Sequence, residues 1–222
     1  MGARQSNITT AVVGAHTNGL KSLLDTGEHS DLLLRCSDGK EFKVHKAIVC
    51  AQSEFFRKAC KPEKFKEGKL NLVELTIGNS TTIGLLLNFL YTMNYANDVK
   101  AKNCLLNNVN LYVAADFYAI EALKKVAAAA FEKHLTEGLW KTGSFPKALE
   151  VIYSETPSSD RKLRDVALAV LMEHAAELFK FDSSVPTELS EVIESLPELS
   201  KDIAIQSLSE VEKFKSAAVK KD

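Results

Sequence analysis

The residue types that most often do chemistry are present, but no catalytic or metal-binding pattern joins them. None of the cysteines forms a CxxC pair, and none has a histidine at zinc-ligand spacing. His174 directly follows Glu173, which is not the HExxH spacing of zinc proteases. The GxxxxGK[S/T], GxGxxG and GxSxG signatures are also missing. We therefore predict no catalytic residue, no cofactor and no metal, and we interpret the thiols as reduced and mostly buried. They are Cys36, Cys50, Cys60 and Cys104.

The first six residues match a lipidation pattern. Met1 to Ser6 reads MGARQS, which fits the M-G-x-x-x-[S/T] motif of N-myristoylation with Gly2 as the acceptor. One acyl chain holds a protein on a membrane only marginally, and neither a cysteine nor a basic cluster lies nearby. A chance match is the alternative interpretation, and membrane binding is not expected without a second signal.

Composition excludes several classes of protein. The chain has 222 residues, of which 45% are hydrophobic, and this is enough apolar material for a folded core. Its 28 basic and 29 acidic residues give a net charge of -1, so a nucleic-acid partner is not expected. No apolar run approaches the roughly 20 residues of a membrane span, and the start lacks a signal-peptide core. We expect a cytoplasmic or nuclear location.

Hydrophobic spacing predicts an α+β domain over residues 17–135. Leu20, Leu23 and Leu24 recur at helical spacing and Gly27 ends that helix; a β-hairpin follows at 31–36 and 41–45. The remaining predicted elements are helices at 46–59, 81–93, 104–117 and 121–135, with Ser53 as an internal N-cap, and a third strand at 70–75.

The two ends of the chain differ from this domain. Residues 1–16 are small and polar and are expected to be flexible, with a short β-leaning stretch at 8–13. Residues 136–222 are expected to be an all-helical extension. Its predicted helices lie at 146–153 and 159–179, and a last one is opened by the capping box Ser195-Leu196-Pro197-Glu198.

Five short motifs stand in order along the chain. They are Ser30-Asp31-Leu32, Phe42 to Val49 (FKVHKAIV), Ser53-Glu54-Phe55-Phe56, Phe89-Leu90-Tyr91-Thr92 and Ala114-Ala115-Asp116-Phe117-Tyr118. Their order and spacing resemble the BTB/POZ domain. The resemblance runs from about residue 19 to residue 135 and implies a small three-stranded sheet flanked by a helical cluster. With its helical tail, the chain is similar to the stand-alone BTB proteins common in fungi. The resemblance implies a non-enzymatic protein-interaction module.

The resemblance also implies self-association. The stripe of Leu20, Leu23 and Leu24 would pack across a two-fold axis onto a second copy, although it could instead cover the core of its own domain. Asp31 and Lys46 would form a partly buried charge pair close to the dimer interface. Longer BTB forms exchange an N-terminal strand, a part that residues 8–13 would take.

A second implied partner is cullin-3. BTB adaptors for this ligase carry a hydrophobic residue, any residue, then Glu, and Phe65-Lys66-Glu67 stands at that place. Tyr118 lies in the second cullin-facing region, and the C-terminal helices would extend the contact and present a substrate protein. Phe65 folding back onto its own domain is the alternative. A dimerising scaffold without cullin contact, in transcription or the cytoskeleton, and an enzyme with an unrecognised C-terminal site also remain open.

Overall fold

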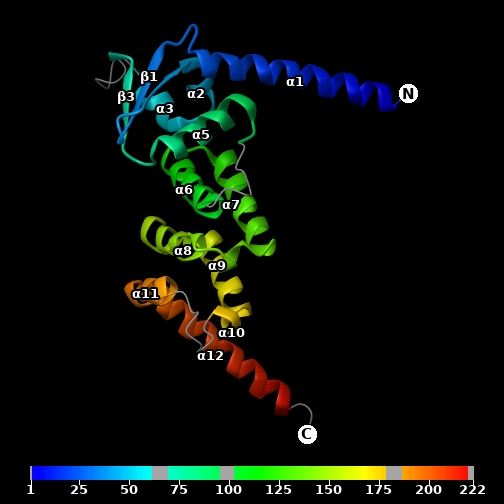
Figure 1. The fold of residues 1–222 in the computed structure, drawn as a ribbon, viewed down its shortest axis with the longest axis vertical. Coiled ribbons are helices and arrows are strands. Elements are labelled where there is room, and N and C mark those ends of the chain that lie inside the picture. The colour runs from blue at the N-terminus through cyan, green and yellow to red at the C-terminus, as the bar shows by residue number, and fades with distance from the viewer. Residues whose placement is uncertain (1, 62–69, 96–102, 179–186, 220–222) are drawn as a thin grey trace. The chain divides into compact units, whose positions relative to one another are not determined.

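The structure is a computed structural model that describes residues 2–61, 70–95, 103–178 and 187–219. The chain divides into two compact units (Figure 1). Unit 1 contains residues 1–98 and 110–127, and unit 2 contains residues 99–109 and 128–222. Two helices, α6 (Cys104–Phe117) and α7 (Glu121–Thr136), contribute turns to both units.

Unit 1 is built on a small sheet whose strand order is β2-β1-β3. The central strand β1 (Leu32–Cys36) pairs antiparallel with β2 (Glu41–Val44) and parallel with β3 (Leu72–Leu75). Alternate residues of β1 are buried, as the two-residue period of a strand requires. Gly39 has a φ of 81° in the hairpin turn, a backbone conformation that favours glycine.

Along the chain, helices stand between the second and third strands and after the third strand. The crossover from β2 to β3 contains α2 (Lys46–Gln52) and α3 (Glu54–Ala59), and α5 (Ser80–Thr92) follows β3. The helix α5 is buried over most of its length, and Asn79 caps it by accepting a hydrogen bond from the Thr82 N–H at 3.0 Å. Ser53 is the N-cap of α3, as predicted. The α+β fold with a three-stranded sheet is confirmed.

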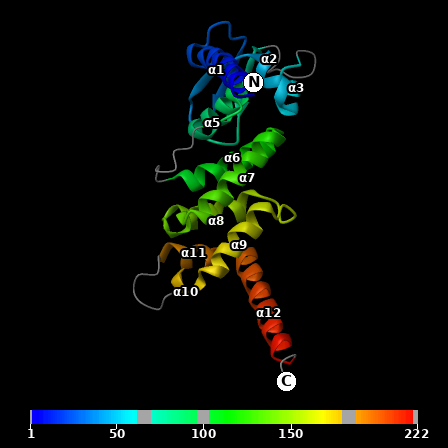
Figure 2. The ribbon, with the colours of Figure 1, turned by 90° about the vertical axis from the view of Figure 1, so that its right-hand side faces the viewer.

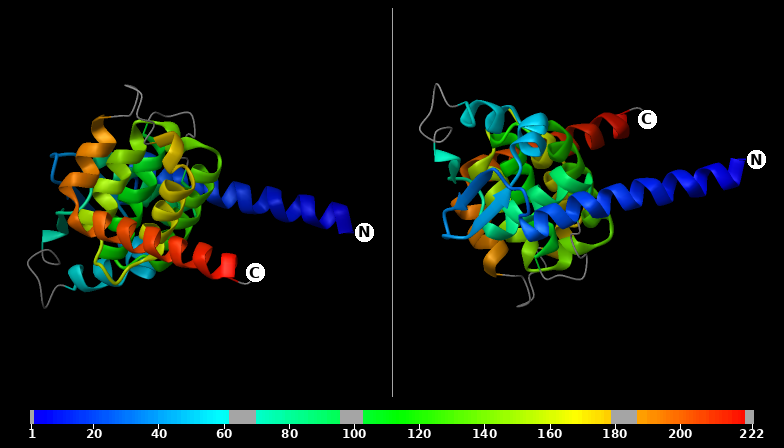
Figure 3. Two further views of the ribbon diagram at one scale, coloured as in Figure 1. Left: turned by 90° about the horizontal axis from the view of Figure 1, so that it is seen from below. Right: turned by 90° about the horizontal axis from the view of Figure 1, so that it is seen from above.

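The N-terminal helix α1 (Gly2–Thr26) begins much earlier than the sequence predicts. Residues 8–13, predicted to lean towards β-structure, are helical, and the helix continues through the range 1–16 that was expected to be flexible. Its C-terminal turns contact α5, and the turns before them extend away from the sheet (Figure 3). Once packing has nucleated the helix, each added residue gains a hydrogen bond, and this outweighs the weak strand preference of two valines.

Unit 2 is helical, in agreement with the predicted extension. Besides its share of α6 and α7, it contains a short 3-10 turn η1 (Leu139–Lys141) and five further helices among the described residues, and α8, α9, α11 and α12 contact one another (Figure 2). The helices are α8 (Ser144–Glu155), α9 (Lys162–Glu173), α10 (Ala175–Leu178), α11 (Thr187–Ser195) and α12 (Pro197–Val219).

Two predictions in unit 2 are wrong. The helix predicted over 159–179 breaks at His174, whose ring stacks on Trp140 with centroids 3.8 Å apart. Ser195 belongs to the end of α11, a helix that the sequence pattern missed, and its hydroxyl donates to the Val192 carbonyl at 2.9 Å. Glu198, the expected capping partner, instead binds Arg164 of α9.

Candidate functional site

An aromatic cluster joins α3 to the end of α6 in unit 1. Phe56 stacks on Tyr118 with centroids 5.6 Å apart, and both rings are fully buried. Phe55 contacts Tyr118 edge-on at 5.0 Å and Phe117 at 5.7 Å. Such edge-on and tilted contacts fix the relative orientation of the rings. The cluster therefore has a buried half, Phe56 and Tyr118, and an outer half, Phe55 and Phe117.

Hydrogen bonds hold this cluster in place. The Ser53 hydroxyl accepts from the Phe56 N–H at 3.1 Å and donates to the Tyr118 carbonyl at 2.6 Å, so it links α3 to α6. The Tyr118 hydroxyl donates to the carbonyl of Ile77 at 2.7 Å and accepts from its N–H at 3.2 Å. Burial raises the pKa of Tyr118 to about 12, so the phenol stays protonated and keeps both bonds.

Phe117 is the residue of this cluster that faces solvent. Its side chain is 47% exposed at the C-terminal end of α6. Its neighbour Asp116 forms an ion pair with Lys124 at 2.6 Å, which puts a polar pair beside the ring. An exposed aromatic ring with a polar rim and a rigid base is the usual arrangement of a protein-binding anchor.

Of the predicted partner-binding residues, the structure describes only Tyr118. Phe65, Lys66 and Glu67 lie outside the described residues. Tyr118 is fully buried, so its side chain is not exposed at the surface of this structure. Phe117, which stands beside it in the same sequence motif, is the exposed ring of the two. The buried residues of α6 recur at helical spacing through Val109 and Tyr112, a pattern that leaves 117 off the buried face.

The leucine stripe of α1 is only partly covered by its own chain. Leu20, Leu23 and Leu24 are each half-buried, and this end of α1 packs on α5. Farther along the helix, Val12 and Val13 are 63% and 58% exposed. The leucine stripe therefore covers part of the core of its own domain, as the alternative interpretation expected. Apolar surface also remains exposed on α1, where a second molecule could pack.

Asp31 and Lys46 are joined through the backbone and not by a side-chain ion pair. The Asp31 carboxylate accepts from the Lys46 N–H at 2.7 Å, in the first turn of α2. A carboxylate is stabilised there by the helix dipole, and it replaces the missing side-chain cap of α2. The Lys46 ammonium donates to the side chain of Asn71. The predicted side-chain charge pair of Asp31 with Lys46 is therefore wrong, because the Asp31 carboxylate instead accepts a hydrogen bond from a backbone N–H at the start of α2.

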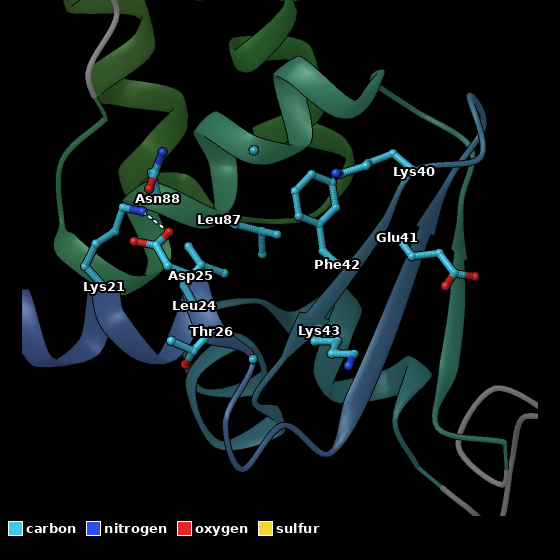
Figure 4. Close-up of a pocket in the computed structure, with 12 residues that line it drawn as sticks. Lys21, Leu24, Asp25, Thr26, Lys40, Glu41, Phe42, Lys43, Leu87 and Asn88 are labelled. Carbon is cyan, nitrogen blue, oxygen red and sulfur yellow. Dashed lines mark hydrogen bonds and ion pairs between the residues drawn. The ribbon is translucent and has the colours of Figure 1, made fainter.

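A cavity of about 410 Å³ opens between α1, β2 and α5 (Figure 4). Leu24, Phe42 and Leu87 form its apolar lining, and the ion pair of Lys21 with Asp25 lies at its edge.

In the described ranges, no three histidine, cysteine or acidic side chains gather as metal ligands. No helix in these ranges is long and apolar enough to cross a membrane.

A buried arginine organises unit 2. Arg164 of α9 is 2% exposed and donates to the backbone carbonyls of Thr156 at 2.7 Å and Tyr153 at 3.2 Å, both at the end of α8. It also pairs with Glu198 in the first turn of α12. One cation therefore satisfies the carbonyl end of one helix and fixes the start of another.

Comparison with known proteins places residues 20–135 in a family. The BTB/POZ domain family matches residues 20–135. A BTB/POZ domain-containing protein of Arabidopsis thaliana is 25% identical over 71% of this chain and 52% of its own length. Human Kelch-like protein 40 is 27% identical over 53% of this chain and 17% of its own. The inhibitor of Bruton tyrosine kinase of Xenopus laevis is 26% identical over 49% of this chain and 8% of its own. The chain thus spans about half or less of these relatives.

Among solved structures, the BTB domain of zebrafish PATZ1 aligns with a TM-score of 0.40 and 19% identity, covering 58% of this chain and 94% of that domain. The family match spans more than half of the chain and includes the hairpin, the α2–α3 pair and the aromatic cluster. The chain belongs to the BTB/POZ domain family, whose fold is a protein-interaction module.

Proposed function

We propose that the chain is a non-enzymatic homodimeric adaptor that binds cullin-3 through unit 1 and a substrate protein through unit 2. The observation that supports it most is the exposed Phe117 ring on a base locked by Ser53 and Tyr118. Phe65 and Glu67 complete the cullin-binding surface in this proposal, as their sequence pattern predicts. An apolar anchor supplies most of the binding energy of such contacts, and a nearby carboxylate fixes orientation.

The dimer in this proposal uses α1. Half-buried leucines at 20, 23 and 24 and the exposed valines at 12 and 13 lie on one helix that is only partly covered by its own unit. A closed pair in which the same patch meets itself would bury this surface. The adaptor would then present two cullin-binding surfaces and two C-terminal helical units.

The test is the affinity of the purified full chain for the N-terminal region of cullin-3, measured by biolayer interferometry. Phe117→Ala is expected to weaken binding at least about tenfold, the loss of about 1.4 kcal/mol, and Phe65→Ala with Glu67→Ala to weaken it further. Val126→Ala is the matched control, because Val126 is 43% exposed on α7 and lies outside the cluster. Cullin binding is refuted if wild type shows no affinity or if all variants bind equally; the dimerising scaffold then remains.

A further inference from the structure

Helix α12 of unit 2 exposes large apolar side chains. Its start is anchored to the unit, because Asp202 accepts a hydrogen bond from Tyr153 of α8 at 2.9 Å. Its later turns extend away from the other helices of unit 2 (Figure 1 and Figure 2). Ile205, Leu208 and Val211 are exposed on this helix, and Leu208 is 66% exposed. Apolar side chains gathered at helical spacing on one exposed helix face indicate a surface for another molecule.

Charged residues continue this face on both sides of its apolar centre. Six exposed residues of α12 recur at alternating intervals of three and four positions, which is the heptad spacing of helices that pair. Apolar residues take the two central places, and each end has one acidic and one basic residue. We call this set the α12 stripe. Its members are Glu198, Lys201, Ile205, Leu208, Glu212 and Lys215.

The order of the charges distinguishes two ways in which the α12 stripe could pair with its own copy. In a parallel pair each residue faces itself, so like charges would meet at all four outer places. In an antiparallel pair whose two-fold axis passes between Gln206 and Ser207, residues equally far from the axis face each other. Opposite charges then meet at every outer place. The facing pairs are Ile205 with Leu208, Lys201 with Glu212, and Glu198 with Lys215.

We propose that α12 pairs antiparallel with α12 of a second copy of this chain through the α12 stripe. The apolar centre supplies the attraction, and the charge order fixes the orientation because the parallel alternative is repulsive. Glu198 also pairs with Arg164 of its own chain, so the inner pair of Lys201 with Glu212 is the one to test.

This contact is small and separate from α1. Residues 198–215 span about 27 Å at 1.5 Å per residue, and each copy contributes two large apolar side chains to the centre. We therefore expect the α12 pair to form at higher protein concentration than the pair through α1. A chain that uses both contacts would link dimers into larger assemblies.

The experiment is analytical ultracentrifugation of the full chain with Leu20→Asp and Leu23→Asp, at concentrations up to about 1 mM and at low ionic strength. These two substitutions remove pairing through α1, so the result is separate from the proposed adaptor dimer. We expect a monomer in dilute solution and a dimer at high concentration. The same series with wild-type α1 follows a dimer-to-tetramer equilibrium instead, which keeps the test available if the α1 variant does not fold.

Charge reversal tests the proposed orientation. Lys201→Glu alone or Glu212→Lys alone brings two pairs of like charges together, and we expect each to weaken the α12 association at least about tenfold. An equimolar mixture of the two single variants restores opposite charges in the mixed pair, and the double variant restores them in its own pair. Both should associate as tightly as the parent chain.

Lys213→Glu is the matched control. Lys213 is exposed on α12 but is not a member of the α12 stripe, and its reversal changes the net charge as much as Lys201→Glu does. It should leave the association unchanged. The proposal is overturned if the parent chain does not associate, which would leave the face to a different protein. It is also overturned if Lys213→Glu weakens association as much as Lys201→Glu, or if neither the mixture nor the double variant recovers it.

Discussion

The Ser53 hydroxyl holds the turn between α2 and α3 through two hydrogen bonds, because it accepts from the Phe56 N–H and donates to the Tyr118 carbonyl. Ser53→Ala removes the cap of α3 and leaves the Tyr118 carbonyl without its hydroxyl donor in a buried site. We expect the free energy of unfolding to fall by about 2 kcal/mol, measured by urea denaturation. Ser22→Ala, at an exposed position of α1, is the control and should change it by less than about 0.5 kcal/mol. Equal costs for the two variants would contradict the assigned role of Ser53.

A single residue, His134, is expected to make the free energy of unfolding depend on pH. Its Nδ1 accepts from the Asn108 side chain at 2.8 Å, and burial lowers its pKa below the ordinary value. The unfolded chain therefore binds the proton more readily than the folded one, so this contribution is complete above about pH 6.5 and is lost as the pH falls below it.

We expect the free energy of unfolding to decrease from pH 7.5 to 5.5, by at most about 1.4 kcal/mol per pH unit from this group. His134→Gln should flatten the decrease in urea denaturation series across that range. His16→Gln is the control, because His16 is exposed on α1, and it should leave the slope unchanged. A slope that survives in His134→Gln would assign the pH dependence to other groups.

At the scale of elements, Arg164 joins α8, α9 and α12. Arg164→Met removes the buried cation and leaves the carbonyls of Tyr153 and Thr156 without this donor, so we expect a cost of about 3 kcal/mol in urea denaturation. Faster amide exchange in the first turns of α12 should accompany it. Arg161→Met is the matched control: its side chain is 39% exposed and pairs with Asp202, and its loss should cost about 1 kcal/mol or less. Similar costs would contradict the central role of Arg164.

For the whole molecule, self-association through α1 decides whether the adaptor is paired. Wild type should sediment as a dimer in analytical ultracentrifugation, and Leu20→Asp with Leu23→Asp should shift it to a monomer, because two charges would enter an apolar contact. Asn18→Asp, exposed on the same helix, adds a charge and should leave the dimer intact. Circular dichroism checks that the double variant stays folded. A wild type that is monomeric at high concentration would refute the paired arrangement.

The order and type of most elements follow from the sequence, because they depend on near neighbours. The apolar run of β1, the alternation in β2, the turn at Gly39 and the caps at Ser53 and Gly27 are local signals, and the structure has an element at each predicted place in unit 1. The motifs that indicated the BTB/POZ fold lie within these elements, so the fold class was predictable as well. The break at His174 was not predicted, and the ring of His174 stacks there on Trp140, a residue more than thirty positions earlier that local patterns do not include.

The exposure and contacts of individual side chains could not be predicted from the sequence and required the tertiary structure. Phe117 and Tyr118 are adjacent in sequence, and only the packing of α6 against α3 buries one ring and exposes the other. The contact of Asp31 with the Lys46 amide likewise depends on where the hairpin meets α2. The sequence by itself determined the fold and its interaction class, since these follow from local patterns. The tertiary structure decided which side chains are exposed, since exposure depends on neighbours that are distant along the chain.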